Sequence, residues 1–239
     1  MTPTILFLVP ARSGSKGVLK KNIALVGGRP MIEWTISAAQ SSKYLSRLIV
    51  STDSSEIADL SRLLGGEVPF LRPCSLSTDY ASSLDVAAHA LGWLEREERY
   101  LPDYVLLLQP TSPLRISNDI DGAITVALEK DASALVSVSP VSCHPFWMRE
   151  IGESGELKDF IKQEGASSQR QGLPKVFGLN GAIYLIKRRV LLEQRSWYPE
   201  NTLAFVMPPE RAIDVDTQWD MHLADLILRE RNAALKNTG

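Results

Sequence analysis

Short apolar runs alternate with amphipathic stretches along most of this chain, and that alternation restricts the folds it can adopt. Residues 5–9 are continuously apolar, which is typical of a strand buried on both faces of a sheet. Residues 31–38 then carry apolar side chains at helical spacing. The order recurs, with further strands expected at 48–50, 68–71, 104–108, 135–138, 183–186 and 204–207, and further helices at 84–94, 120–128 and 219–228. Repeated strand-then-helix order predicts an α/β fold, a Rossmann-like and mostly parallel sheet with helices on both faces.

A helix start is predicted directly after the strand at 48–50. Asp53 is followed three residues later by Glu56, which resembles a capping box. In such a box, side chains accept hydrogen bonds from backbone N–H groups at the first turn of the helix. We therefore expect Asp53 to cap the next helix.

The strand-and-helix rhythm stops after Pro140. Residues 140–175 are polar and irregular and contain four glycines. Long loops inside a compact domain are usually functional or covered by something else. A chain of 239 residues suits one large α/β domain. We expect a single domain, 1–239, with a protruding arm or dimerisation lobe formed by residues 140–175 and about 190–205.

Composition argues against several classes of partner. The net charge of −2 disfavours a general nucleic-acid binder, which is usually basic. No stretch approaches the ~20 apolar residues of a membrane span, so no membrane partner is expected. Cys74 and Cys143 lie far apart and form neither a disulfide framework nor a zinc spacing. These observations favour a cytoplasmic protein.

The turn after the first strand carries an unusual amount of positive charge. Its sequence, VPARSGSKGVLKKN at 9–22, holds two glycines, two serines and four cations, and the first acid in the chain is Glu33. In open α/β sheets, ligands collect beyond the carboxyl ends of strands, and glycine-rich turns form anion-binding concavities. Neither the P-loop pattern nor G-x-G-x-x-G fits. The loop predicts a polyanionic partner such as a triphosphate; the alternative is a solvated basic loop.

Two carboxylates, Asp214 and Asp216, stand near the other end of the chain in the segment IDVDT. Residues two apart in an extended segment project to the same face. Magnesium typically binds through one or two carboxylates plus substrate phosphates and keeps several waters. The pair predicts a site for Mg²⁺, with Mn²⁺ as a substitute, opposite the basic loop. Alternatively, Asp216 caps the final helix, and both roles can coexist.

Six blocks of the sequence resemble, in order, the cytidylyltransferases that make CMP-sialic acid and related CMP-nonulosonates. The blocks are ARSGSKGVLKKN (11–22), IVSTDSSEIA (49–58), FLRPCSLSTDYASS (70–83), LLQPTSPLR (107–115), LNGAIYLI (179–186) and IDVDT (213–217). One block alone would be weak evidence, whereas six in the right order are highly specific. The resemblance covers nearly the whole chain and implies a fold of the nucleotidyltransferase (GT-A-like) type.

The resemblance also implies roles for single residues. Arg12, Lys21 and Asp216 become the expected catalytic residues. The implied nucleotide-binding set is Arg12, Ser15, Lys16, Lys21, Asn22, Arg72, Ala81 and Ser83; the sugar-binding set is Gln109, Arg170, Tyr184, Trp197 and Tyr198; and the metal ligands are Asp214 and Asp216. A guanidinium can grip a carboxylate through two hydrogen bonds, which suits Arg170 and a 2-keto acid. Two alternatives stay open: a strand-end ion pair for Arg72 and a solvated position for Arg170.

A homodimer with shared active sites is also expected. Phe146, Trp147, Trp197 and Tyr198 are aromatic residues in segments without a clear period, and exposed aromatic side chains commonly mark interfaces. The resemblance implies that the two aromatics at 197–198 reach into the neighbouring site. The alternative is that these rings cover their own core.

The implied reaction is nucleotidyl transfer from CTP to an acidic nine-carbon sugar. The anomeric hydroxyl attacks the α-phosphorus and pyrophosphate leaves, so the protein mainly positions groups and neutralises charge. Phe177-Gly178-Leu179 lacks the basic residue that often precedes NGAIY, and Trp147 stands where a lysine can occur. A less polar pocket favours a deoxy, diacylamino sugar such as legionaminic acid. The rivals are a CMP-3-deoxy-octulosonate synthetase, a nucleotide-sugar-dependent glycosyltransferase, in which Asp214 and Asp216 read as D-x-D, and a nucleotide-sensing module.

Overall fold

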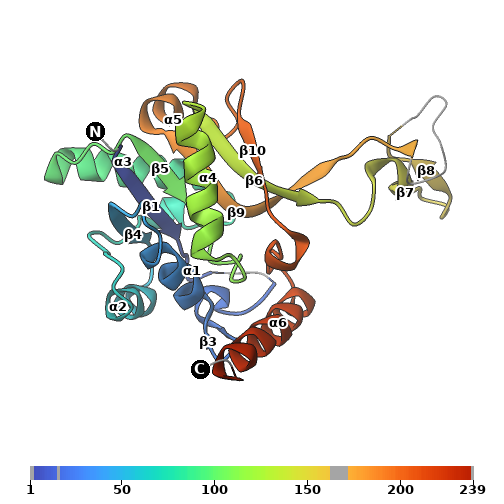
Figure 1. Ribbon diagram of the computed structural model, residues 1–239, viewed down its shortest axis with the longest axis horizontal. Coiled ribbons are helices and arrows are strands. Elements are labelled where there is room, and N and C mark those ends of the chain that lie inside the picture. Colours follow the sequence, from blue (N-terminus) through green and yellow to red (C-terminus); the bar gives the residue numbers. More distant parts are fainter. Residues whose placement is uncertain (1–2, 15–16, 162–171, 238–239) are drawn as a thin grey trace.

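The computed structural model describes residues 3–14, 17–161 and 172–237. Six strands form the central sheet: β1 (Ile5–Pro10), β4 (Arg47–Ser51), β5 (Tyr104–Leu107), β6 (Ala134–Pro140), β9 (Phe177–Lys187) and β10 (Leu203–Val206). Their order in the sheet is β10-β6-β9-β5-β1-β4 (Figure 1). β1 pairs in parallel with β4 and β5, and β10 with β6, whereas β9 runs antiparallel to β5 and β6. The predicted mostly parallel sheet is confirmed, with β9 as the exception.

The segment expected as a strand at 68–71 contributes only isolated bridges. Ile49 pairs with Glu67 and Thr52 pairs with Leu71, both in parallel. The prediction of a continuous strand here is therefore wrong. The apolar run that suggested it packs Val68 into the core without extending the sheet's hydrogen-bond ladder.

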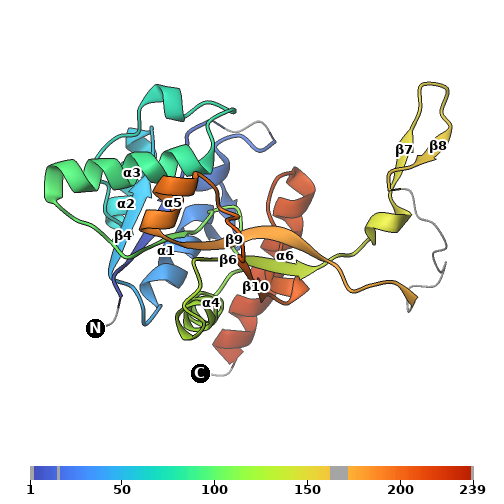
Figure 2. The same cartoon turned by 90° about the horizontal axis from the view of Figure 1, so that it is seen from above.

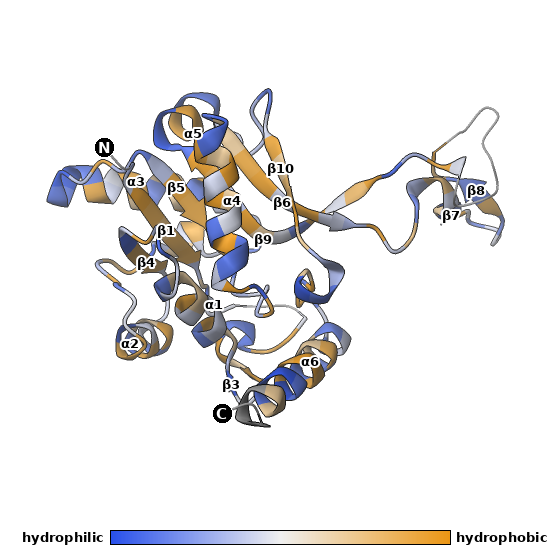
Figure 3. Ribbon diagram, viewed as in Figure 1, coloured by the Kyte–Doolittle hydropathy of each residue, from blue (hydrophilic) through white to orange (hydrophobic). Residues whose placement is uncertain are grey.

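Helices cover both faces of the sheet, as predicted (Figures 1 and 2). One face carries α1 (Met31–Gln40), α2 (Ser55–Leu63) and α4 (Ser117–Glu129), and the other carries α3 (Ser83–Glu98) and α5 (Arg188–Gln194). Successive side chains of a strand point to opposite faces. Accordingly Ile5, Phe7 and Val9 join the first core, while Leu6 and Leu8 join the second. Each such buried side chain stabilises the fold by roughly 1.5–3 kcal/mol. In Figure 3 the strands of the central sheet are mostly orange, the colour of hydrophobic residues.

The start of α2 differs from the predicted capping box. Ser54 is the N-cap, and its side chain accepts a hydrogen bond from the Ile57 backbone N–H. Asp53 is not the cap, because its carboxylate binds a segment distant in sequence, described below. A serine and an aspartate are equally good caps, so adjacent candidates could not be separated by sequence alone.

The final helix, α6 (Gln218–Asn237), covers a small hairpin made of β2 (Leu25–Val26) and β3 (Arg29–Pro30). A third apolar cluster, which includes Val26, Val215 and Leu228, lies between these elements. The C-terminal part of the chain is thereby packed against the segment that follows the basic loop. None of the helices in the described part of the chain combines the length and apolar composition that a membrane crossing needs.

An arm extends away from the body where β6 ends and β9 begins (Figures 1 and 2). It carries a short 3₁₀ turn at Pro145–Trp147 and the hairpin β7 (Arg149–Ile151) and β8 (Leu157–Asp159). The other segment expected in the arm, 190–205, lies instead on the body. There α5 packs on β9 and α3, and β10 pairs with β6.

Candidate active site

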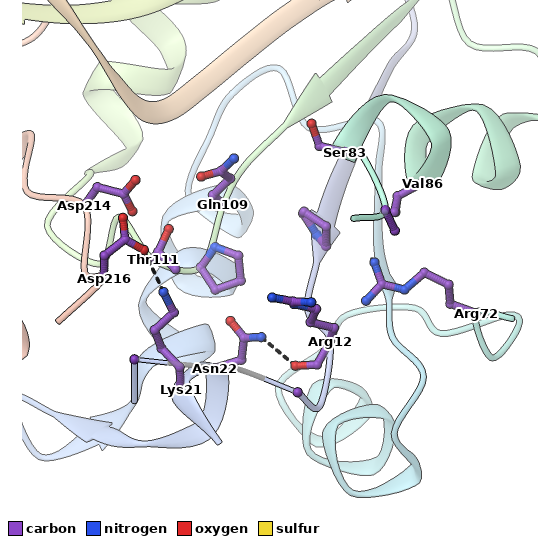
Figure 4. A pocket seen from close by; sticks show the side chains of 15 residues that line it. Arg12, Lys21, Asn22, Arg72, Ser83, Val86, Gln109, Thr111, Asp214 and Asp216 are labelled. Atoms are coloured by element: carbon purple, nitrogen blue, oxygen red, sulfur yellow. Dashed lines mark hydrogen bonds and ion pairs between the residues drawn. The ribbon is translucent and has the colours of Figure 1, made fainter. Parts of the chain in front are cut away.

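A cavity of about 380 Å³ opens beyond the carboxyl ends of β1 and β5 (Figure 4). Ligands collect at this edge in open α/β sheets. The cavity brings together most of the predicted site residues: Arg12, Lys21, Asn22, Arg72, Ala81, Ser83, Gln109, Asp214 and Asp216. Ser15, Lys16 and Arg170 lie outside the described residues. Tyr184, Trp197 and Tyr198 are described but are not part of the lining.

The basic loop is fastened at both ends. Asn22 Nδ2 donates to the Arg12 carbonyl at 2.8 Å. Asp53 accepts from the Ser13 backbone N–H at 2.8 Å and from the Ser13 hydroxyl at 2.7 Å. Lys20 does not line the cavity; its Nζ pairs with Glu56 Oε2 at 2.7 Å. The loop therefore presents Arg12 and Lys21 to the cavity, while Lys20 holds the loop to α2.

Gly17 is needed where this loop passes the acidic segment. A Cβ atom at position 17 would lie 2.1 Å from the Asp216 carbonyl oxygen, too close for any side chain. The basic loop and the acidic segment are thus in direct backbone contact, although 199 positions separate 17 from 216 in the sequence. This contact places the two charged halves of the site opposite each other.

Two contacts anchor the acidic segment. Val215 is fully buried, and its backbone N–H donates to the Thr111 carbonyl at 2.8 Å. Upstream, Arg211 makes a two-pronged ion pair with Asp119, at 2.9 Å for both Nη2–Oδ1 and Nε–Oδ2. Asp214 and Asp216, on either side of Val215, both face the cavity, as their spacing predicted.

Asp216 does not cap α6, so that alternative is wrong. Asp220 Oδ2 accepts from the backbone N–H groups of Asp216 and Thr217, at 3.2 and 2.8 Å. The Thr217 hydroxyl in turn lies 3.2 Å from the Asp220 backbone N–H and accepts from it. Thr217 and Asp220 therefore form a reciprocal cap, and the Asp216 carboxylate stays available to the cavity.

The two carboxylates have different surroundings. Lys21 Nζ donates to Asp216 Oδ1 at 2.9 Å and to the Val215 carbonyl at 2.8 Å. Burial, reinforced by the nearby Asp216 charge, raises the pKa of the Asp214 carboxyl above its usual range. Asp214 Oδ1 is buried and makes no hydrogen bond to any described residue. An orphaned carboxylate oxygen beside a second carboxylate fits a hard divalent cation.

The pair alone does not complete a metal site. Within the described ranges, no group of three or more His, Cys, Asp or Glu residues could hold an ion. Two carboxylates plus oxygens from a bound phosphate and from water make the set that magnesium prefers. The donors therefore fit Mg²⁺ that arrives with a phosphate ligand.

Arg72 and Ser83 lie at the opposite end of the cavity (Figure 4). Ala81 is also part of the cavity lining. Arg72 is 5% exposed, and its Nε and Nη2 atoms make no hydrogen bond to any described residue. Its ion-pair partner, Asp53, is distant, with Oδ1 3.9 Å from Nη2. Burial, with a smaller contribution from the Arg12 charge, lowers the pKa of the Arg72 guanidinium. Arg72 thus offers unused donors to a ligand, and the strand-end ion pair is long.

Gln109 and Asp214 meet at Gly181, a residue to which the sequence assigned no role. Gly181 has φ +72°, and a Cβ atom there would lie 3.0 Å from both Gln109 Oε1 and Asp214 Oδ2. The register between β6 and β9 shifts near this point, between Val136 and Val138. An isolated glycine within a strand-like run is the signal that could have predicted such an irregularity.

The aromatic residues expected at the sugar end pack together on the body. Trp197 is only 7% exposed and belongs to the core beneath α3, with Nε1 donating to Ser83 Oγ at 3.0 Å. The expectation of an exposed Trp197 is therefore wrong. Tyr184 contacts the rings of Trp197 and Tyr198, with centroids 5.7 and 6.4 Å apart. Of the three, Tyr198 is the exposed one.

The basic loop and the carboxylate pair share one cavity at the carboxyl edge of a mostly parallel sheet. This arrangement is typical of a nucleotidyltransferase. The cytidylyltransferase family model matches residues 6–185, well over half of the chain. The chain belongs to the cytidylyltransferase family, as its sequence blocks predicted.

Curated relatives are similar over most of this chain. Post-translational flagellin modification protein B of Campylobacter coli is 33% identical, over 98% of each chain. The CMP-N,N'-diacetyllegionaminic acid synthase of Legionella pneumophila is 35% identical, over 97% of this chain and 99% of its own. An N-acylneuraminate cytidylyltransferase of Escherichia coli is 32% identical over 97% of this chain but only 54% of its own.

Solved structures agree on the fold. A CMP:2-keto-3-deoxy-manno-octonic acid synthetase complexed with CTP superposes with a TM-score of 0.70, covering 95% of this chain and 99% of its own. A 4-diphosphocytidyl-2C-methyl-D-erythritol synthase gives 0.66 over 95% and 99%. Sequence identities of 17% and 15% make these a likeness of fold alone.

Proposed function

We propose that this enzyme transfers the CMP group of CTP to a nonulosonic acid, an acidic nine-carbon sugar, and releases pyrophosphate. The observation that carries the proposal is the division of charge within one cavity. Arg12 and Arg72 line one side, and Asp214 and Asp216 line the other (Figure 4). Nucleotidyl transfer needs both halves, because a polyanion must be bound and the charge on its phosphates must be neutralised.

CTP would lie along the cavity with its base towards Arg72 and its phosphates on the basic loop. The unused Arg72 donors, with Ala81 and Ser83, suit the carbonyl and ring acceptors of a pyrimidine. Arg12 and Lys21 carry the charges that face the phosphates. Gln109 faces the remaining part of the cavity, where the sugar acid would bind.

Asp214 and Asp216 would hold Mg²⁺, or Mn²⁺ in its place, through hard oxygen donors. When bound, the ion would neutralise phosphate charge and lower the pKa of the attacking anomeric hydroxyl. Lys21, already hydrogen-bonded to Asp216, stands where it can contact a phosphate oxygen beside that carboxylate. The protein's own contribution is then to orient the hydroxyl in line with the leaving pyrophosphate.

Legionaminic acid is the sugar we favour within this class. The name of the Legionella relative supports this choice. Phe177, Gly178 and Leu179 do not line the cavity of their own chain. Trp147 lies in the 3₁₀ turn of the arm and does not line the cavity of its own chain. Its influence on sugar choice would therefore require a second subunit whose cavity the arm approaches.

A substrate panel tests the function. The protein is incubated with CTP, Mg²⁺ and one of N,N'-diacetyllegionaminate, N-acetylneuraminate or 3-deoxy-octulosonate, and pyrophosphate and the CMP-sugar are quantified by enzymatic assay and mass spectrometry. The expected result is CMP-sugar formation, fastest with the legionaminate. Fastest turnover of 3-deoxy-octulosonate would favour the rival synthetase. Transfer from a preformed nucleotide-sugar, with no pyrophosphate, would indicate a glycosyltransferase, and CTP binding without any product would indicate a sensor.

Arg72→Met is expected to raise the KM for CTP about 10- to 100-fold, because hydrogen bonds from charged groups are worth about 1.5–3 kcal/mol. The thermal midpoint should change little, since the lost group has only the distant Asp53 as an ionic partner. Arg62→Met is the control, because Arg62 pairs with Asp59 on the surface of α2. An unchanged KM for CTP in Arg72→Met would exclude Arg72 from nucleotide binding.

We further propose a homodimer in which the arm of one chain reaches the other chain's site. Ile151 and Leu157 at the hairpin are 76% and 71% exposed, and Phe160 beside them is 57% exposed. Apolar side chains gathered on an extension with little core of its own are typical of an interface. The family resemblance supports the same arrangement.

Replacing Ile151 and Leu157 together by serine is expected to convert the dimer to a monomer and to lower turnover. Sedimentation velocity at the assay concentration gives the assembly state. Leu63→Ser on α2, where Leu63 is 86% exposed, is the control for loss of a surface leucine. A fully active wild-type monomer would end the proposal of shared sites.

A cytoplasmic location is part of the same proposal. Cys74 and Cys143 are both exposed free thiols. Such thiols persist in reducing compartments. Fractionation of cells that produce the protein would test the assignment.

A further inference from the structure

Arg115 is a buried cation that takes no part in lining the cavity. Its side chain is 2% exposed, and it donates to three oxygens: the Ala182 carbonyl at 2.7 Å, the Thr35 hydroxyl at 2.8 Å and the Gln109 carbonyl at 3.2 Å. Thr35, on α1, also points its hydroxyl at the Gln109 carbonyl, at 3.5 Å. One planar guanidinium therefore ties together the chain after β5, the middle of β9 and helix α1.

The two carbonyls held by Arg115 belong to the segments that meet at the sugar end of the cavity. Gln109 supplies the side-chain amide that lies against Gly181, and Ala182 is the residue after Gly181. Asp214 approaches the same glycine from the other side. The Arg115 fork thus spans the two strand segments whose separation sets the gap between Gln109 and Asp214.

This arrangement is costly for the fold. No described carboxylate lies within ion-pair distance of Arg115, and Asp119, four residues on, is engaged by Arg211. Arg115 Nε has no hydrogen-bond partner among the described residues, and burial lowers the pKa of the guanidinium to about 9. Burying a charge without an opposite charge carries a penalty of several kcal/mol. A neutral side chain could join two carbonyls at lower cost, so the rigid multi-donor fork itself is what the site uses.

We propose that Arg115 is a positioning residue that fixes the distance between Gln109 and the Gly181 segment, and so the opening through which the sugar acid reaches Asp214. For the identity of the sugar, this inference rests on the proposed function. It predicts a defect confined to the sugar end, because the CTP contacts lie on segments that Arg115 does not touch: the loop after β1 and the stretch from Arg72 to Ser83, the first residue of α3.

The test compares Arg115→Gln and Arg115→Lys with Arg231→Gln. Arg231 also directs both terminal nitrogens to a backbone carbonyl, that of Leu114, the residue before Arg115. It touches neither strand segment, so it matches Arg115 as an arginine fork without the proposed role. Arg115→Lys keeps the charge and loses the planar fork.

The first readout is hydrogen–deuterium exchange of the free protein, which needs no substrate. In Arg115→Gln, the amides of Leu108, Ala182 and Ile183 should exchange about 10-fold faster or more, while those of β1 and β4 stay at wild-type rates. Arg231→Gln should leave all of these amides unchanged. Equal protection of residues 180–183 in wild type and Arg115→Gln would overturn the proposal.

The second readout is the division between kinetic constants. In Arg115→Gln, kcat/KM for the sugar acid should fall about 100-fold, a size expected for misplacement of a substrate by ~1 Å. The KM for CTP should stay within about twofold, and Arg115→Lys should fall in between. A parallel rise in both KM values, or a loss of activity that follows only the fraction unfolded, would make Arg115 a structural residue and overturn the proposal.

The design distinguishes a variant that fails to fold from a failure of the proposed function. If the glutamine variant does not fold, the lysine variant carries both readouts, and wild-type exchange together with wild-type sugar kinetics in that variant would overturn the role of the fork. If the wild-type protein turns over no sugar acid with CTP, the proposed function fails, and the exchange result alone decides whether Arg115 positions the two segments.

Discussion

Replacing Asp216 by asparagine is expected to lower metal-dependent turnover about 1000-fold in a protein that remains folded. The change is nearly isosteric and removes one anionic oxygen ligand, and a loss of ~4 kcal/mol of transition-state stabilisation corresponds to three orders of magnitude. The side chain is 72% exposed, so little packing is lost. The asparagine carbonyl can still accept from Lys21. The measurement is kcat as a function of Mg²⁺ concentration, with the thermal midpoint recorded alongside.

Asp220→Asn is the matched control for this experiment. Asp220 is a nearby carboxylate that caps α6, so its change should cost about 1 kcal/mol of stability and leave turnover within about threefold of wild type. Near-normal activity of Asp216→Asn in saturating Mg²⁺ would contradict the assignment of Asp216 as a metal ligand.

Gly181→Ala is expected to reduce kcat/KM about 100-fold. The backbone at φ +72° disfavours any residue with a Cβ atom by about 1–2 kcal/mol. The added methyl would also press on Gln109 Oε1 and Asp214 Oδ2 at 3.0 Å, so both side chains must move. Displacement of groups that hold the sugar and the metal should reduce turnover more than it reduces stability.

Gly28→Ala separates the two effects. Gly28 also has positive φ, +82°, but a Cβ atom there would meet nothing within 4 Å. It should show the same loss of thermal stability with wild-type kinetic constants. If the two alanine variants had equal kinetic constants, backbone strain alone would account for Gly181, and its closeness to Gln109 and Asp214 would have no kinetic role.

The sheet could be predicted from sequence because its strands are short apolar runs with no polar alternation. β1 and β5 are buried along nearly their whole length, so each appears as a continuous run. The direction of β9 could not be predicted in this way. A strand buried between two neighbours has the same apolar pattern whether it runs parallel or antiparallel.

Only those site residues could be predicted that the charge or spacing within their own short segment marks. Arg12, Lys21 and the Asp214–Asp216 pair stood out because their segments are unusual in composition. Asp53 was misassigned because its partner, Ser13, comes close only through the pairing of β1 with β4. Arg115 lay inside a quoted block without a role, since its acceptors are backbone carbonyls that no sequence pattern marks.

β9 connects the base of the arm to the buried centre of the sheet, and the two parts of the strand pair differently with β6. Its first residues, Phe177 to Leu179, pair with the end of β6 at the base of the arm, and the register shift near Val138 lies between them and the buried half of the strand. The register shift therefore separates the base of the arm from the buried half of β9. An arm taken from another family member and grafted between Pro140 and Gly178 should leave the pairing of Tyr184, Leu185 and Ile186 intact. If the arm forms the proposed dimer and reaches the partner's cavity, assembly and sugar choice could diverge among relatives while the nucleotide half of the cavity stays constant.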